Sequence, residues 1–267
     1  MDEPDARSLA ERVCLLVSSS DNTADVFQQV APAFSRHWPA CKLDRFVGGN
    51  SPPATAVDGF TPVLCPQASG WREELAHQVA ALPAQYDHVL LFLDDFLILD
   101  TVDDKALMRL LAESLAQRLP YLRLWPELRS LAGQAVWRLG AGRATGALVA
   151  LPADTPYYSA LQVTLWQRAH LAALLDHAGS IWDFELQRPA ATHYAVAGAP
   201  PIRYRHVVER GLWMRDAPWL FRRAGLRFDP GRRAIAPWSQ LLRHGWRRAK
   251  FAAIGYAWYR RRLARQA

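Results

Sequence analysis

The sequence has 267 residues, 51% of them hydrophobic and 21% charged, which describes a globular chain able to bury one large core or a core plus an appendage. Its three cysteines, Cys14, Cys41 and Cys65, have no Cys-x-x-Cys spacing, so they argue against a disulfide framework or a zinc knuckle and favour a reducing compartment. The net charge of +7 is uneven, because residues 1–200 carry 15 Lys+Arg and 22 Asp+Glu whereas residues 201–267 carry 17 and 3. An acidic body with a basic end is typical of a protein attracted to an anionic surface.

The first hundred residues alternate between expected strands and expected helices. Short apolar runs predict strands at 13–17, 42–47, 62–65 and 89–93, and amphipathic spacing predicts helices at 23–38 and 71–82. A surface helix at 103–119 and a strand at 121–124 follow. This alternation predicts an α/β fold with a mostly parallel sheet, helices on both faces, and ligands beyond the carboxyl ends of the strands.

Two adjacent acids, Asp94 and Asp95, interrupt an apolar run that extends from residue 89 to residue 99. Two carboxylates in a poorly solvated place cannot both ionise cheaply, which indicates a bound divalent cation or a shared proton. Hard oxygen ligands at the carboxyl end of a strand suit Mg²⁺ or Mn²⁺ holding phosphate oxygens. Asp21, after the first strand, is expected at the same edge. The plainer interpretation is that the pair closes a strand and caps the next turn.

Several common site motifs are absent from the sequence. Neither Gly-x-x-x-x-Gly-Lys-Ser/Thr nor Gly-x-Gly-x-x-Gly follows the first strand, which argues against P-loop NTPases and dinucleotide-binding Rossmann enzymes. The serines at 18–20 lack the glycines of a nucleophile elbow, which argues against a serine hydrolase.

Aromatic and acidic side chains are interleaved in residues 156–185, which end in Trp-Asp-Phe-Glu at 182–185. Flat apolar faces beside carboxylates are suited to stacking a sugar ring and removing a hydroxyl proton. The alternative is that the aromatics are core contacts and the acids belong to the first turn of a helix.

Together these segments resemble bacterial glycosyltransferases of the nucleotide-sugar-dependent GT-A type, in particular a poorly characterised group of polysaccharide-biosynthesis proteins. The resemblance spans most of residues 11–215. It rests on Ser-Ser-Ser-Asp at 18–21, Gly-Trp at 70 and 71, Leu-Asp-Asp-Phe at 93–96, and Leu-Gln-x-x-x-Trp-x-Arg-x-x-Leu through Trp-Asp-Phe-Glu at 161–185. It implies a GT-A-like (Rossmann-like) catalytic domain over residues 1–235.

The resemblance also implies roles for individual residues. Asp94 and Asp95 become the metal and diphosphate site, with Mn²⁺ or Mg²⁺ as the cofactor. By similarity to late histidines of some GT-A enzymes, His193 or His206 is a candidate to complete the metal shell, whereas most of the histidines are expected to be structural. Glu185 becomes the base that deprotonates the acceptor hydroxyl, with Asp183 as its substitute. The residues implied to bind the nucleotide-sugar are Ser18, Asp21, Trp71, Asp94, Gln162 and Trp182. The sequence departs from the usual Asp-x-Asp motif of the family, because Leu93 stands in the first place of that motif.

The implied reaction moves a sugar from a nucleotide-diphosphate donor to a glycan or lipid-linked acceptor in cell-surface polysaccharide synthesis. A cation bridging the diphosphate neutralises the charge that develops on the leaving group. We expect inversion at the anomeric carbon because a single base then suffices, whereas a double displacement needs a second, nucleophilic carboxylate.

The last 32 residues, 236–267, are expected to form a separate basic helix studded with aromatics. Its apolar side is lined by Trp238, Leu242, Trp246, Phe251, Ile254 and Trp258. With the arginines around them, residues 238–267 are suited to an anionic membrane surface. The alternative is a helix packed on the body with a solvated basic face. Because no apolar stretch approaches a membrane span or a signal segment, we expect a cytoplasmic protein, peripheral on the inner face of the cytoplasmic membrane.

The main alternative from another class is a non-catalytic membrane-surface or polymer-binding component of envelope assembly. In that case Asp94 and Asp95 are structural and the basic end provides the function. Nucleic-acid binding has only the arginine-rich end in its favour and lacks a recognisable reading motif.

Overall fold

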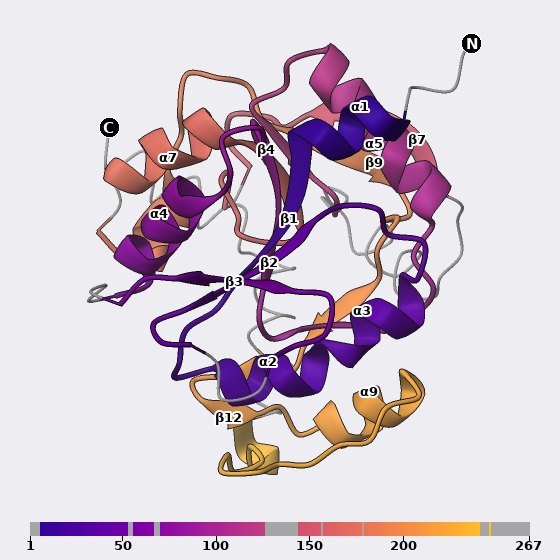
Figure 1. The fold of residues 1–267 in the computed structure, drawn as a ribbon, viewed down its shortest axis with the longest axis vertical. Coiled ribbons are helices and arrows are strands. Elements are labelled where there is room, and N and C mark those ends of the chain that lie inside the picture. The colour runs from indigo at the N-terminus through magenta and orange to yellow at the C-terminus, as the bar shows by residue number, and fades with distance from the viewer. Residues whose placement is uncertain are drawn as a thin grey trace.

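An eight-stranded sheet forms the centre of the fold (Figure 1). The structure is a computed structural model that describes residues 6–52, 56–66, 70–125, 144–155, 157–177, 179–240 and 246. In spatial order the strands are β3 (Thr61–Leu64), β2 (Arg45–Gly49), β1 (Val13–Ser18), β4 (His88–Leu93), β8 (Thr164–Gln167), β6 (Tyr121–Arg123), β9 (Tyr194–Gly198) and β7 (Ala144–Ala150). The first four are parallel, β6 and β9 are parallel, and β8 and β7 run antiparallel to their neighbours. The predicted mixed, mostly parallel sheet is confirmed.

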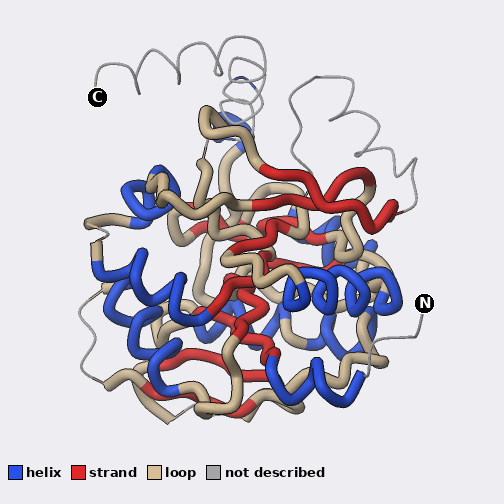
Figure 2. The backbone as a smooth tube through the Cα atoms, turned by 90° about the horizontal axis from the view of Figure 1, so that it is seen from above, coloured by secondary structure: helices blue, strands red, loops and turns tan. Residues whose placement is uncertain are grey.

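Helices cover both faces of the sheet, as Figure 2 shows from above. The first face holds α1 (Ala6–Arg12), α2 (Ala24–Val30), α3 (Pro32–His37), α5 (Asp104–Ala116) and α9 (Ala217–Arg223). The second holds α4 (Trp71–Ala81), α7 (Arg168–Asp176) and α8 (Ile181–Leu186).

The central strands supply side chains to both hydrophobic cores in alternation. In β1, Leu15 and Val17 belong to the first core while Cys14 and Leu16 belong to the second. Successive side chains of a strand point to opposite faces, so a strand covered on both sides must be apolar at every position. This is why β1 and β4 read as continuous apolar runs.

The prediction of one continuous helix over residues 23–38 is wrong. The structure has two helices there, α2 and α3, which meet at Ala31. Pro32 is the first residue of α3, where its missing N–H costs nothing, but it cannot continue the hydrogen bonding of α2.

The apolar run from residue 89 to residue 99 is divided between two sheets. After β4, Asp94 and Asp95 form a turn, and β5 (Phe96–Ile98) then pairs antiparallel with β10 (Tyr204–His206). A C-terminal lobe, residues 208–240, follows β10 and contains the hairpin of β11 (Val208–Glu209) and β12 (Leu212–Trp213) and helix α9. In Figure 1 this lobe lies at the edge of the molecule, beyond α2.

Helix α4 is fixed at its carboxyl end by Arg168, the first residue of α7. Its guanidinium donates to the carbonyl oxygens of Ala80 (3.0 Å), Leu82 (2.8 Å) and Pro83 (3.0 Å). These carbonyls at a helix end would otherwise lack a partner, and an arginine there also complements the helix dipole. Because α4 also carries Gln78, which contacts Ser19, the position of α4 helps to place the loop after β1.

Within the described part of the chain, no helix is both long and apolar enough to cross a membrane. The predicted basic helix over 236–267 lies almost wholly outside the described residues, which include only 236–240 and 246 of it. The division of the chain at residue 235 therefore stays a prediction.

Candidate functional site

The pairing of β1 with β4 brings Ser19 and Asp94 together. The two strands are parallel and Ser18 lies opposite Leu93, so the next residue of each strand leaves the sheet at the same place. There the Ser19 hydroxyl donates to Oδ2 of Asp94 at 2.8 Å. The register of the two central strands thus sets the position of the acid pair.

Asp94 is half-buried, and the loss of solvent around its carboxyl group raises the pKa from 3.8 to about 7. The neighbouring charge of Asp95 raises the pKa further, whereas hydrogen bonds from Thr23 and Ser19 and the charge of Arg233 lower it. Asp94 is therefore protonated through much of the acidic range.

His206 stands beside the second acid. Because β10 pairs with β5 so that His206 lies opposite Phe96, its Nδ1 comes within 3.5 Å of Oδ2 of Asp95. His193 lies elsewhere, buried with its Nε2 at 2.9 Å from that of His170. Of the two late histidines considered from the sequence, His206 is the one placed next to the acid pair.

Asp21 joins the loop after β1 to the loop after β2. Its carboxylate accepts hydrogen bonds from the backbone N–H groups of Asn50 (2.8 Å) and Ser51 (3.1 Å) and from the Ser51 hydroxyl. The Ser51 hydroxyl is the main cause of a lowered pKa, so Asp21 is ionised at neutral pH. Its place at the carboxyl edge of the sheet is as predicted.

An apolar pocket opens beside Asp21. Its walls come from β2, β3, α2 and the intervening loops, and include Phe27, Val47, Val57, Phe60, Pro62 and Leu64. Ser19, Ser20, Asp21 and Ser51 line it on the polar side. A pocket with apolar walls and a few polar groups at one side can hold a flat ring, such as a nucleobase, and orient its polar edge.

Gln78 of α4 contacts Ser19, which lines this pocket, and it was not identified from the sequence. Its side chain is 1% exposed, and Nε2 donates to the Ser19 carbonyl at 2.8 Å. A Cβ at Gly48 would lie 2.1 Å from Nε2 of Gln78, so a larger residue there would have to displace the buried Gln78 amide from its contact with Ser19. The signal in the sequence was a glutamine on the apolar side of the helix at 71–82.

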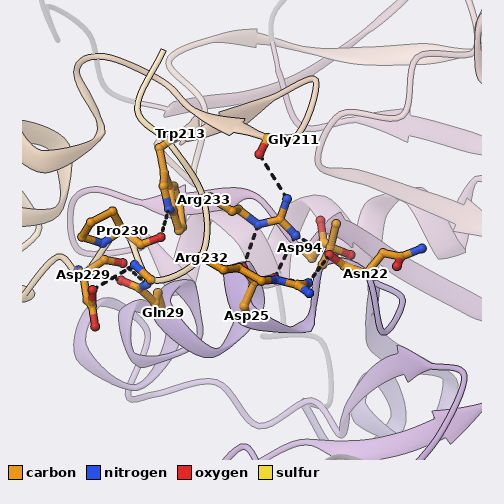
Figure 3. Close-up of polar contacts among 12 residues, drawn as sticks. Asn22, Asp25, Gln29, Asp94, Gly211, Trp213, Asp229, Pro230, Arg232 and Arg233 are labelled. Atoms are coloured by element: carbon orange, nitrogen blue, oxygen red, sulfur yellow. Dashed lines mark hydrogen bonds and ion pairs between the residues drawn. The ribbon is translucent and has the colours of Figure 1, made fainter.

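A basic strap, residues 229–233 of the C-terminal lobe, runs along α2, from Gln29 near the end of the helix to Asn22 and Asp25 at its start (Figure 3). Arg233 donates to both carboxylate oxygens of Asp25, at 2.7 and 2.8 Å, and to the Gly211 carbonyl at 3.2 Å. Arg232 donates to Asp25 at 3.0 Å and to the Asn22 carbonyl at 2.8 Å. Although burial opposes the shift, the hydrogen bonds from the two arginines lower the pKa of Asp25 to about 2.

The strap brings positive charge to the acid pair. The side chain of Arg233 is only 11% exposed, and its charge acts on Asp94, which Figure 3 shows beside it. The basic end of the chain is visible in the sequence, but the pairing of these arginines with Asp25 is not.

Glu185 lies on α8, with its Oε1 accepting a hydrogen bond from the Leu161 N–H at 2.9 Å. Burial raises its pKa, against the effect of that hydrogen bond and of the charges of Arg123 and His206. A carboxylate with a raised pKa is a better proton acceptor than one in water. His206 acts electrostatically on Glu185 and pairs with Asp95, so it links the acid pair to α8.

Asp183 has a structural contact in the same helix. Its carboxylate accepts from the N–H (2.9 Å) and the hydroxyl (2.7 Å) of Ser180, and the Ser180 hydroxyl accepts from the Asp183 N–H, which forms a capping box. Phe184 is fully buried. For these two residues the structure agrees with the plainer interpretation, a core contact and an acid in the first helical turn.

The remaining predicted residues lie in two places, near the pocket and near α8. Ser18 is the last residue of β1, and Ser19 and Ser20, not Ser18, line the pocket. Trp71 opens α4 and packs edge-on against Phe184 at 5.8 Å between ring centroids. Near α8, Oε1 of Gln162 is buried without a hydrogen-bond partner among the described residues. Trp182 is 62% exposed on α8.

The acid pair offers two carboxylates to a cation. Among the residues that the structure describes, no group of three His, Cys, Asp or Glu side chains is arranged to hold a metal ion. Mg²⁺ is commonly bound by one or two carboxylates together with phosphate oxygens of a substrate, and the donors present fit that mode of binding.

The comparisons with known proteins give distant structural likenesses only. No protein-family model and no curated protein matches the chain. A structure of S. aureus TarS 1–349 has 9% identity and a TM-score of 0.43 over 69% of this chain and 58% of that one. The 4-diphosphocytidyl-2C-methyl-D-erythritol synthase from Anaerococcus prevotii has 9% identity and a TM-score of 0.41 over 76% of this chain and 93% of that one. The bifunctional IspDF from Campylobacter jejuni has 12% identity and a TM-score of 0.41 over 73% and 52%.

The raised pKa of Asp94 predicts a pH-dependent effect of removing its charge. Because the native state holds a proton that the unfolded chain releases, the ionised carboxyl destabilises the fold increasingly as pH rises from about 4 to about 7. We expect Asp94→Asn to match the wild type in urea unfolding at pH 4.5 and to exceed it at pH 8, by on the order of 2 kcal/mol. A difference between the two proteins that is the same at both pH values would contradict this assignment.

Proposed function

We propose that the protein is a glycosyltransferase that uses a nucleotide-diphosphate sugar. The observation that carries this proposal is the apolar pocket beside Asp21, which opens at the same sheet edge as the Asp94 and Asp95 pair. A nucleoside diphosphate needs an apolar slot for its base and cationic or metal-bound groups for its phosphates. The pocket and the acid pair lie on neighbouring loops, which supports the proposal.

In the proposed complex the base occupies the pocket between α2 and β3, and the diphosphate extends toward Asp94 and Asp95. These carboxylates would hold Mg²⁺ or Mn²⁺, which when bound supplies positive charge to the departing diphosphate. The fixed charge of Arg233 beside Asp94 acts in the same sense.

Glu185 is the proposed base. It takes the proton of the acceptor hydroxyl as the oxygen bonds to the anomeric carbon, and the bond from that carbon to the diphosphate breaks. Attack by the acceptor oxygen on the face of the sugar opposite the diphosphate, assisted by this single base, gives inversion. The exposed ring of Trp182 on the same helix offers a flat surface for a sugar of the glycan or lipid-linked acceptor.

The role in cell-surface polysaccharide synthesis, the cytoplasmic location and peripheral membrane attachment through residues 238–267 belong to this proposal. The competing proposal is a non-catalytic component of envelope assembly in which the acid pair is structural. The burial of Asp94 against Ser19 and Thr23 is compatible with either, so ligand binding must separate them.

Nucleotide binding is tested by thermal unfolding with a panel of nucleoside diphosphates, with and without Mn²⁺. A ligand at 100 times its Kd stabilises the native state by about 2.7 kcal/mol, which raises the midpoint by several degrees. We expect one nucleotide to give such a shift only with Mn²⁺, and Asp95→Asn to abolish it.

Asp100→Asn is the matched control, because Asp100 lies on the same segment but pairs with Arg203 and Arg223. This variant should keep the nucleotide shift. If no nucleotide shifts the midpoint, or if Asp95→Asn leaves the shift unchanged while deletion of residues 238–267 abolishes function in cells, the competing proposal is correct.

The two acids of α8 are expected to differ in their effect on turnover. Glu185→Gln removes the base and should lower kcat for release of the nucleoside diphosphate by about 10²- to 10⁴-fold while keeping the nucleotide-induced thermal shift. Asp183→Asn should leave kcat within a few-fold and cost about 1 kcal/mol of stability through its cap. The reverse ranking of the two variants would assign the base to Asp183.

A further inference from the structure

The outer side of α9 carries an aromatic and basic surface. Ala217, Leu220, Phe221 and Ala224 are buried against the body, so the opposite side of the helix faces outward. Residues three and four apart share a helical face, which groups Trp219 with Arg222 and Arg223 on that side. The Trp219 side chain is 53% exposed. Figure 1 shows α9 at the periphery of the molecule.

A second exposed tryptophan lies against an arginine of the same lobe. The guanidinium of Arg215, just before α9, lies 4.8 Å from the ring centroid of Trp238, which is 62% exposed. The guanidinium of Arg223 likewise lies 5.7 Å from the Trp219 ring. We call Arg215, Trp219, Arg222, Arg223 and Trp238 the lobe face.

The lobe face has a surplus of positive charge. Arg223 shares Asp100 with Arg203, and the nearby Asp216 pairs with Arg205 at 3.3 Å. Neither Arg215 nor Arg222 forms an ion pair with a carboxylate among the described residues. Beyond Trp238 the sequence continues this pattern, since residues 241–267 contain eight Lys+Arg, no Asp or Glu, and further aromatics.

We propose that the lobe face docks on an anionic lipid surface. Indole rings prefer the boundary between headgroups and acyl chains, where their apolar faces are buried and their N–H groups stay hydrated. Arginines next to them bind lipid phosphates and keep their aliphatic stems in the same layer. Two exposed tryptophans, each under an arginine, fit this partner better than a nucleic acid, which the lobe face offers no groove or reading element to receive. The proposal does not depend on the transferase reaction.

Co-sedimentation of the full chain with vesicles tests the proposal. Vesicles of phosphatidylcholine with phosphatidylglycerol should bind the protein, phosphatidylcholine alone should not, and added salt should weaken binding. Arg215→Ala with Arg222→Ala should lower the partition coefficient by about 25-fold, at about fivefold for each cation removed. Trp219→Ala with Trp238→Ala should lower it by about tenfold.

Val149→Ala is the control, because Val149 is an exposed apolar residue, 40% exposed, that lies on β7 and outside the proposed sites. It should bind vesicles as the wild type does. Arg215→Lys with Arg222→Lys keeps the charge and should retain binding, which guards against a folding defect in the alanine variants. The proposal is overturned if the alanine variants partition as the wild type, if neutral vesicles bind equally well, or if only an oligonucleotide binds.

Discussion

The contact between Ser19 and Asp94 is the constraint on which the rest of the site depends. It exists because β1 and β4 pair in parallel with Ser18 opposite Leu93, so that the chain leaves both central strands at one point. Both strands are covered by helices, and the first polar groups beyond them are therefore poorly solvated. A carboxyl group in that place has a high pKa and a strong tendency to bind a proton or a cation. The same edge also receives the pocket and Asp21.

The chain returns twice to this edge from its carboxyl-terminal third. First, β10 pairs with β5 and sets His206 beside Asp95, where it also acts on Glu185. Second, the strap fixes the C-terminal lobe to α2 through Arg232, Arg233 and Asp25. The acid pair thus lies between an imidazole, which is 3.5 Å from Asp95, and a guanidinium, whose charge acts on Asp94. If the lobe face docks on lipid, the lobe that supplies the strap is also the part of the protein that meets the membrane.

The sequence was sufficient for elements whose signals are local. The apolar runs of β1 and β4 identified buried strands, and the alternation of strands and helices placed Asp21 and Asp94 at one edge. The helix break at Pro32 was not predicted, because the helical pattern of apolar residues continues on both sides of it. The Arg233 contact with Asp25 spans 208 positions, and β5 and β10 have three residues each, too few for a periodic signal. An acid in the first turn of a helix was one interpretation of both Asp183 and Glu185. Only the structure shows that Asp183 caps α8 whereas Glu185 accepts from the Leu161 N–H.

A crystal structure of the full chain with the stabilising nucleoside diphosphate and Mn²⁺ tests most directly where a donor binds. The account predicts the base in the pocket lined by Phe27 and Phe60, the phosphates toward the strap, and an anomalous peak for Mn²⁺ within coordination distance of Asp94 or Asp95. A base bound outside that pocket, or a metal peak apart from both carboxylates, would contradict it.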